Sequence, residues 1–353
     1  MEENGMKKIV LLPPGPKNPR NSEGDFIQLR DGRVLFVYTH FTSGRGDHAK
    51  AFLAGRFSSD GGDTWTEEDT MILPNEGEWN IMSVSMLRLQ DGRIALFYMR
   101  KNSLSDCRPL VRISTDEAET WSEPVGVIPN EDMGYYVLNN DRVVQLKSGR
   151  ILLPVALHNR PGWKNPDWVG EITCFLSDDL GRTWRCCKTR QKAYSPKKKR
   201  VVAQEPGVVE LKGGRVMMFV RTNVGVQYCS FSEDGGESWS ALEPSDIASP
   251  QSPASIERIP TTGDLLMVWN NHAGVSKERA GLRTPFTTAL SLDEGKTWVN
   301  VRTIEEDPQG WYCYTAVEIV GDHVLLGHCS GKRSQALATT QITRFPVRWL
   351  YGE

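Results

Sequence analysis

Short, strongly apolar runs recur along the chain, and each one is preceded by a tight polar turn. The turn contains a glycine, followed by arginine in four of the six copies, and a second apolar segment leads into it. Two apolar segments around a glycine turn are typical of a β-hairpin, because glycine accepts the positive φ that such turns require. The pattern predicts hairpins at four close and two looser copies: residues 29–38, 89–98, 146–155, 211–220, 261–269 and 320–328.

A second repeat alternates with the first. It reads S-x-D-x-G-x-[ST]-W, with Ala118 in place of the glycine in one copy. Serine and aspartate side chains fold back onto turn amides, so each copy is predicted to be a self-satisfied hairpin turn whose tryptophan packs between strands. The five copies occupy residues 58–65, 114–121, 177–184, 232–239 and 291–298. Their serines lie 55 to 63 residues apart, a period close to that of a propeller blade.

The two repeats together predict an all-β fold, a six-bladed β-propeller with four strands in each blade. The last blade lacks the second repeat, and residues 336–345 are predicted to supply its third strand. We expect residues 7–13 to add the fourth strand and close the ring, because an open ring would expose a sheet edge. No linker interrupts residues 1–353, which predicts a single domain.

The composition of the chain limits the classes of partner that can be expected. The chain has 353 residues and a net charge of -2 at pH 7, which favours neither nucleic acid nor an anionic membrane as a partner. The apolar run Ile9–Leu12 is too short for a signal-peptide core or a membrane span. We therefore expect a cytoplasmic location if this N-terminus is native, and a periplasmic or secreted one if a signal peptide was removed. Seven cysteines without a C-x-x-C pair favour free thiols.

The sequence gives little indication of a metal site or of a nuclear-import signal. The six histidines are not spaced as pairs of ligands, so we expect no metal site and no cofactor. The basic segment 195–202 looks like a nuclear-import signal, but in a repeat protein it is better read as a solvated loop. The oligomeric state stays open.

Five such turns in a six-bladed pattern resemble the Asp-box (BNR) repeats of the sialidase (neuraminidase) superfamily, over nearly the whole chain. The resemblance implies an exo-acting glycoside hydrolase that cleaves a terminal, acidic sugar and has a glycan or glycoside as its partner. Propellers with Asp-boxes also exist without sialidase activity, so the fold alone does not give the function. A carbohydrate-binding propeller and a scaffold propeller for protein partners remain alternatives.

The same resemblance implies three catalytic residues. Asp47, on a loop shortly before the first Asp-box, matches the acid/base that protonates the leaving oxygen, a role that calls for a raised pKa. Glu205 in "QEPGVVELKGGR" matches the glutamate that polarises a tyrosine nucleophile. Tyr314 in "GWYCYTAVEIV" is that tyrosine, with Tyr312 as the nearby alternative. A neutral phenol suits an anomeric carbon that carries a carboxylate.

Sialidases also bind the substrate carboxylate with three arginines. Arg221 and Arg283 match the second and third of these by their positions relative to the inner strand and the Asp-box. The first is missing, because alignment on the glycine turn puts Glu23 at its position. Arg20 lies three residues earlier and could turn into the site. Glu23 and Asp25 face the same side if the strand is regular, which would add negative charge near Asp47 and repel a sialic acid carboxylate. A carboxylate there could instead accept hydrogen bonds from sugar hydroxyls or serve as a second catalytic carboxylate.

Further polar residues near strand ends are candidates for the wall of a central sugar-binding cleft. The candidates for contacts with sugar hydroxyls or charges are Arg100, Asp106, His158, Asn159, Asn271 and His272, and Trp163 or Trp168 is the candidate stacking platform. Each of them, taken alone, is also compatible with a purely structural role.

Overall fold

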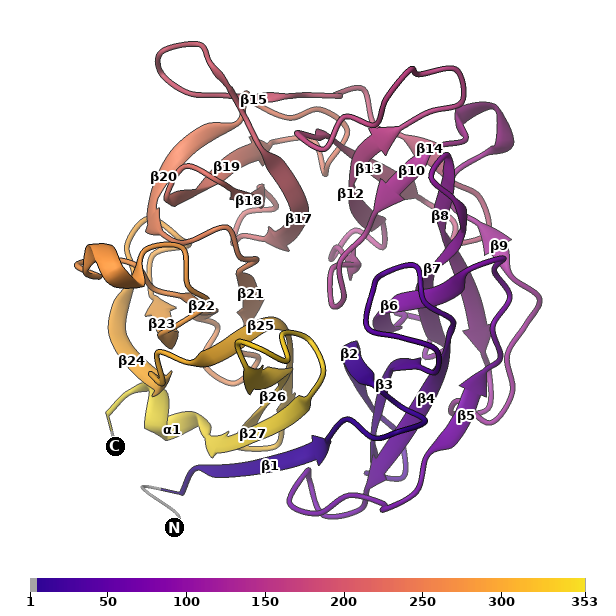
Figure 1. Ribbon diagram of the computed structural model, residues 1–353, viewed down its shortest axis with the longest axis vertical. Helices are drawn as coiled ribbons and strands as arrows, with labels where there is room; N and C mark the ends of the chain where they lie inside the picture. The colour runs from indigo at the N-terminus through magenta and orange to yellow at the C-terminus, as the bar shows by residue number, and fades with distance from the viewer. Residues whose placement is uncertain (1–4, 353) are drawn as a thin grey trace.

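The computed structural model describes residues 5–352. It is an all-β structure whose blades surround a central axis, with β2, β6, β17, β21 and β25 near the middle of the ring (Figure 1). Four blades are separate four-stranded sheets. Their strands are β2 (Arg20–Gln28), β3 (Val34–Phe41), β4 (Ala51–Ser58) and β5 (Thr70–Leu73); β17 (Ala203–Glu210), β18 (Val216–Thr222), β19 (Val226–Ser232) and β20 (Glu243–Ala248); β21 (Ser255–Arg258), β22 (Leu265–Asn270), β23 (Phe286–Ser291) and β24 (Val299–Glu305); and β25 (Gly310–Val320), β26 (His323–Lys332) and β27 (Thr340–Pro346) with β1 (Lys7–Leu12).

The second and third blades form one continuous sheet. β10 joins them, because Tyr135 pairs in parallel with Cys107 of β8 while β10 also pairs antiparallel with β12. The strands of these blades are β6 (Asn80–Arg88), β7 (Ile94–Ser103), β8 (Asp106–Ser114), β9 (Val125–Gly126), β10 (Tyr135–Val137), β11 (Val144–Gln145), β12 (Ile151–Asn159), β13 (Glu171–Ser177) and β14 (Arg185–Cys186). The remaining elements are β15 (Ala193–Tyr194), β16 (Arg200–Val201), η1 (Asn130–Asp132), η2 (Lys277–Arg279) and α1 (Val347–Leu350). The six-bladed propeller is thus confirmed.

The apolar runs after the glycine turns become the second strands of the blades, and both their faces are covered. Leu35 and Val37 of β3 pack with Leu96 of β7 in a cluster between the first and second blades. A strand buried on both faces needs a nearly continuous apolar sequence, which is why these runs stand out along the chain.

The Asp-box turns have the predicted internal hydrogen bonds. In the first copy, Asp60 accepts from the backbone N–H of Thr64 at 2.8 Å and from its hydroxyl at 2.6 Å. The Trp65 indole donates to the Gly62 carbonyl at 3.2 Å. Slight burial opposes ionisation, but the hydrogen bonds from Thr64 and Ser58 lower the pKa of Asp60 to about 2. These aspartates therefore belong to the fold.

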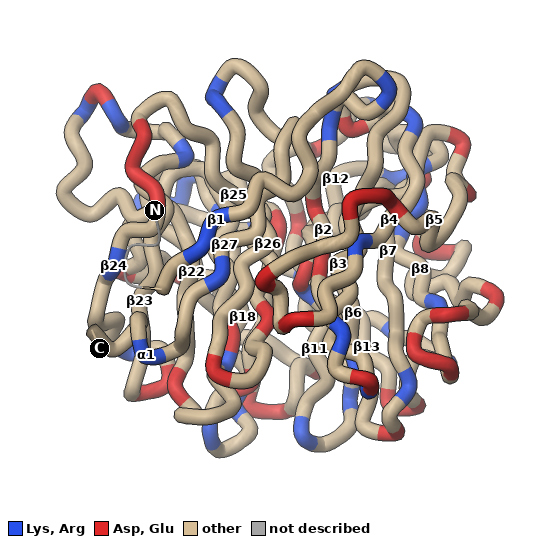
Figure 2. Tube along the Cα trace, turned by 90° about the horizontal axis from the view of Figure 1, so that it is seen from below, with Lys and Arg blue, Asp and Glu red and all other residues tan. Residues whose placement is uncertain are grey.

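β1 pairs antiparallel with β27 and forms the outermost strand of the last blade, so the two ends of the chain share one sheet (Figure 1). Basic and acidic residues are interspersed over the molecule, the loops at both ends of the ring included (Figure 2). No helix within residues 5–352 is long and apolar enough to cross a membrane.

Candidate active site

Four innermost strands contain a β-bulge at the same height. At each bulge a residue other than glycine has a positive φ: Glu23 in β2 (φ 56°), Ser83 in β6 (φ 60°), Glu205 in β17 (φ 51°) and Tyr314 in β25 (φ 54°). The left-handed region is unfavourable for such residues by about 1–2 kcal/mol each, and strain of this kind is often found at functional sites. All four side chains line one pocket.

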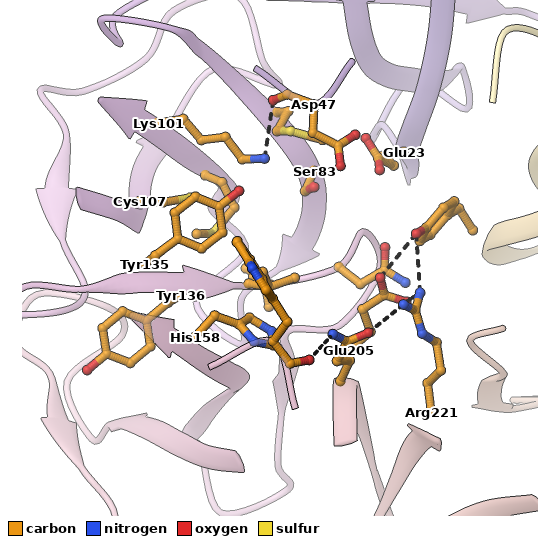
Figure 3. Close-up of a pocket in the computed structure, with 18 residues that line it drawn as sticks. Glu23, Asp47, Ser83, Lys101, Cys107, Tyr135, Tyr136, His158, Glu205 and Arg221 are labelled. Carbon is orange, nitrogen blue, oxygen red and sulfur yellow. Dashed lines mark hydrogen bonds and ion pairs between the residues drawn. The ribbon is translucent and has the colours of Figure 1, made fainter. Parts of the chain in front are cut away.

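That pocket lies on the axis of the ring and has a volume of about 220 Å³. Figure 3 shows Asp47, Glu23, Ser83 and Lys101 on one side of it, with Glu205 and Arg221 on the other. The lining residues are Glu23, Asp47, Met82, Ser83, Met99, Lys101, Cys107, Tyr135, Tyr136, Val137, Leu138, Asn139, His158, Trp168, Gln204, Glu205, Arg221 and Tyr314.

Tyr314 and Glu205 form a hydrogen-bonded pair although they lie 109 residues apart in the sequence. The Tyr314 hydroxyl donates to Glu205 Oε1 at 3.1 Å, and Arg221 Nη1 donates to Glu205 Oε2 at 2.6 Å. Burial, followed by the Glu205 charge, raises the pKa of Tyr314 well above its usual value. The phenol is therefore neutral, and its proton already points at a carboxylate that can accept it.

Asp47 lies on the loop between β3 and β4. Its backbone carbonyl accepts hydrogen bonds from Asn80 at 2.9 Å and from Lys101 at 3.3 Å, while its carboxylate pairs with Arg20 at 2.6 Å. Burial favours the neutral acid, but Arg20 and Lys101 outweigh it and lower the pKa of Asp47. The expectation of a raised pKa is thus wrong for this structure, because two cations approach the loop.

Arg20 contacts two carboxylates of the site, Asp47 and Glu23, but does not itself line the pocket. It is 2% exposed, and it donates to Asp47 Oδ1 and to Glu23 Oε1, the latter at 3.1 Å. Burial raises the pKa of Glu23, and the charge of Arg20 opposes this rise. Arg20 and Glu23 therefore form an ion pair beside the pocket, and the carboxylate partly neutralises the charge of the arginine.

Arg283 lies behind Tyr314. Its guanidinium stands over the Trp311 ring at 4.9 Å and over the Tyr314 ring at 5.2 Å. Its Nη1 is buried and has no hydrogen-bond partner among the described residues. The side chain adjoins the nucleophile candidate without lining the pocket.

Asp25 is not part of this pocket, which corrects the sequence analysis. The bulge between Ser22 and Asp25 shifts the register of β2, so Glu23 and Asp25 do not face the same cavity. Asp25 is buried further along the strand, where it accepts hydrogen bonds from the N–H groups of Phe26 and Met86, both at 2.7 Å.

Other predicted residues also lie outside the pocket lining. Asp106 pairs with Arg108 at 2.7 Å, and Asn271 closes a turn by accepting from the Ala273 N–H at 2.9 Å. His272 Nε2 lies 2.9 Å from the Leu282 carbonyl. Asn159 and Trp163 are also absent from the lining, and Tyr312 packs against Phe286.

Arg100 is excluded by strand parity. Arg221 follows its turn glycine, Gly214, by an odd number of residues, whereas Arg100 follows Gly92 by an even number. Side chains alternate along a strand, so a shift of one residue changes the face. Lys101 has the parity of Arg221 and lines the pocket.

His158 and Trp168 do line the pocket, and Trp168 is 48% exposed. Ser83, Lys101, Tyr135 and Gln204 also line it but were not predicted from the sequence. Ser83 could have been found by aligning it with Glu205 on the glycine turn, and Lys101 by its parity. Tyr135 gives no local signal, because it reaches the pocket from the irregular connection between two blades. Within residues 5–352, no group of three or more His, Cys, Asp or Glu side chains is placed to hold a metal ion.

The ring of blades and its Asp-box turns define a β-propeller of the sialidase type. The chain belongs to the family described as BNR repeat-like domain, whose model matches residues 70–326. It is 23% identical over 321 residues to a sialidase of Micromonospora viridifaciens, a match that covers 81% of this chain and 46% of that protein. The chain thus spans about half the length of this relative.

Solved structures agree on the fold. A Dyadobacter fermentans protein of unknown function matches with a TM-score of 0.75 at 18% identity, covering 97% of this chain and 99% of the other. A Hadza microbial sialidase matches with a TM-score of 0.74 at 16% identity, covering 94% and 67%. Trypanosoma rangeli sialidase matches with a TM-score of 0.74 at 14% identity, covering 97% and 60%.

Proposed function

We propose that this protein is an exo-acting glycoside hydrolase that removes a terminal acidic sugar from a glycan or glycoside. The observation that carries the proposal is the hydrogen bond of 3.1 Å between the Tyr314 hydroxyl and Glu205, across one pocket from Asp47. A nucleophile, a base that activates it and a separate acid are the groups that a two-step displacement at an anomeric carbon needs.

In the first step, Glu205 takes the phenolic proton as Tyr314 attacks the anomeric carbon, and Asp47 protonates the departing oxygen. In the second step, Asp47 takes a proton from water, which attacks the same carbon and releases Tyr314, and Glu205 returns the proton to the phenolate oxygen. Asp47 must carry a proton before the first step. A sugar bound beside it would remove water and weaken its contact with Arg20, and both changes raise the pKa of a carboxyl group.

The substrate class rests on the cations around the pocket, Arg221, Arg283 and Lys101, which favour an acidic sugar. The relatives named sialidase point the same way. Glu23 opposes Arg20, and loss of one charge-assisted contact costs on the order of 1.5–3 kcal/mol. We therefore expect ordinary sialosides to be poorer substrates than another acidic glycoside.

Turnover of a panel of 4-methylumbelliferyl glycosides tests this proposal. The panel contains sialic acid, other 2-keto sugar acids, uronic acids and their neutral parents. Release of fluorophore from at least one acidic member, lost in Tyr314→Phe and retained in Tyr312→Phe, is the expected result. Release that is unaffected by Tyr314→Phe would contradict it.

A carbohydrate-binding propeller without catalysis is the second candidate, and the lowered pKa of Asp47 favours it. This candidate predicts that sugars bind in the pocket while no member of the panel is turned over. Sugar titration by calorimetry beside the turnover assay separates the two.

A further inference from the structure

Lys101 is a buried cation in the pocket that the proposed reaction does not use. Its side chain comes from β7 and is 6% exposed. Nζ donates one hydrogen bond, to the Asp47 backbone carbonyl at 3.3 Å, and lies 5.6 Å from the centre of the Tyr135 ring. No carboxylate oxygen within residues 5–352 is at ion-pair distance from it. An ammonium has three N–H donors, so two of them have no acceptor among residues 5–352.

The ammonium is charged. Burial works against the charged form, yet the neighbouring Cys107, Tyr135 and Asp47 leave the pKa of Lys101 raised. A buried charge without a paired counter-charge is costly to the folded protein. A ligand that brings an anionic oxygen would remove that cost.

The arginines around the pocket are largely occupied. Arg20 donates to Ser22, Asp47, Glu23 and the Arg45 carbonyl. Arg221 donates to Glu205, Gln204 and the Tyr314 hydroxyl. Arg221 uses three of its five N–H donors, and its Nε has no partner among the described residues, whereas Lys101 uses one of three. Lys101 is therefore the lining cation least committed to protein acceptors.

The position of Lys101 sets the geometry of that ligand. Figure 3 shows it across the pocket from Glu205 and Arg221, with the Ser83 side chain on its own side. The anomeric carbon must approach Tyr314, beside Glu205. An acidic group held by Lys101 must then project from the far side of the sugar ring and not from the anomeric carbon.

We propose that Lys101 binds the carboxylate of a hexuronic acid, with the anomeric carbon toward Tyr314, so that the preferred terminal sugar is a uronide. This proposal rests on the proposed function, because Tyr314 fixes the position of the anomeric carbon. A 2-keto sugar acid has its carboxylate on the anomeric carbon and would leave Lys101 without an anion. Ser83 is placed to contact a hydroxyl of the same sugar.

Calorimetric titration tests this assignment without requiring turnover. The ligands are glucuronic, galacturonic and mannuronic acids, their neutral hexoses, and N-acetylneuraminic acid. At least one hexuronic acid is expected to bind ten times more tightly than its neutral hexose and more tightly than N-acetylneuraminic acid. Lys101→Met should remove this preference, Lys101→Arg should keep part of it, and Arg100→Met, one residue away on the opposite face, should leave it unchanged.

Three results would overturn the proposal: a preference that survives Lys101→Met, tighter binding of N-acetylneuraminic acid than of every hexuronic acid, or no preference for any hexuronic acid. If Lys101→Met does not fold, Lys101→Gln and the methyl ester of the best hexuronic acid serve instead. Undiminished binding of the acid by Lys101→Gln, together with undiminished binding of the methyl ester by the wild-type protein, would equally contradict the proposal. Binding through Lys101 without hydrolysis of aryl uronides would refute catalysis alone. Tyr314-dependent hydrolysis that is indifferent to Lys101 would refute this assignment alone.

Discussion

The innermost strands build two acidic cavities along the axis of the ring, and the cavities treat their carboxylates differently. In the candidate active site, Asp47, Glu23 and Glu205 are paired with Arg20 or Arg221. Further along the same strands, toward the glycine turns, a second cavity of about 520 Å³ is lined by Asp25, Asp141, Glu257 and Glu318. None of these four, all within the described residues, forms an ion pair.

In the second cavity, burial is the largest influence on the pKa values of the carboxyl groups. It raises the pKa of Asp141 to about 6 and that of Glu318 to about 7. Arg88 and Arg258 also line the cavity but are paired with Glu117 and Glu294. Asp141 accepts a hydrogen bond from the Val317 N–H at 3.0 Å, which links two blades. Carboxylates paired with arginines stay charged in the active site, whereas burial shifts the unpaired carboxylates of the second cavity toward their protonated form.

Among the changes that distinguish the two cavities, removal of the proposed nucleophile should have the largest effect on activity. Tyr314→Phe is expected to reduce kcat by about 10³-fold or more, because it removes the atom that bonds to the sugar. Tyr312→Phe, two residues away but packed on Phe286, should stay within about twofold of wild type. Steady-state kinetics on the best aryl glycoside checks both, and comparable losses in the two variants would place the nucleophile elsewhere.

Asp47→Ala should separate substrates by leaving group. Glycosides with alkyl or sugar leaving groups need protonation and should lose about 10²–10⁴-fold in kcat/KM. Activated aryl glycosides leave unaided and should lose much less. Equal losses for both classes would remove Asp47 from the role of acid.

A direct test compares two carboxylates that lie two residues apart on β2. Glu23→Gln removes a counter-charge of Arg20 in the active site, and we expect kcat/KM to change by about tenfold with a shifted acidic limb of its pH profile. Asp25→Asn affects only the second cavity and should leave both unchanged. A pH profile moved by Asp25→Asn would mean that the two cavities act as one.

The second cavity also predicts a pH dependence of stability. Glu318 has a folded pKa of about 7 against 4.5 unfolded, so the folded state holds a proton that the unfolded state loses in that range. Stability should therefore fall as pH rises from about 4.5 to 7 and then level off. Glu318→Gln should remove about 1–3 kcal/mol of this fall, measured by urea unfolding, while exposed Glu119→Gln should not. A fall that is identical in Glu318→Gln and wild type would contradict the assignment.

The sequence was sufficient for the fold because each blade repeats local signals: a glycine turn, an apolar strand and an Asp-box such as that of Asp60. The residues of the site were harder to predict. Asp25 was assigned to the wrong cavity because a bulge, which shifts strand register, has no sequence signature as clear as a glycine turn. Arg100 was predicted and Lys101 was not, although strand parity places Lys101 on the same face as Arg221.

Contacts between residues that are far apart in the sequence were a further obstacle to predicting the site. His48 lies 4.2 Å from the Trp79 ring and 6.3 Å from Tyr135, and Trp168 lies 5.7 Å from Tyr135. These aromatic residues come from loops and strand ends of different blades, so only the closed ring brings them together. The pKa values of Asp47 and Glu23 depend in the same way on Arg20 and Lys101, which lie on neighbouring blades.

In the proposed reaction, Tyr314 is activated by Glu205 and forms a covalent bond to the sugar. Incubation with fluorinated glycosyl fluorides of the uronic and 2-keto sugar acids slows the second step, and peptide mass spectrometry then locates the adduct. We predict one added glycosyl unit on the peptide containing Tyr314, absent in Tyr314→Phe and retained in Tyr312→Phe. Turnover of an activated glycoside with no adduct, or with the adduct on Glu205 or Tyr312, would contradict it.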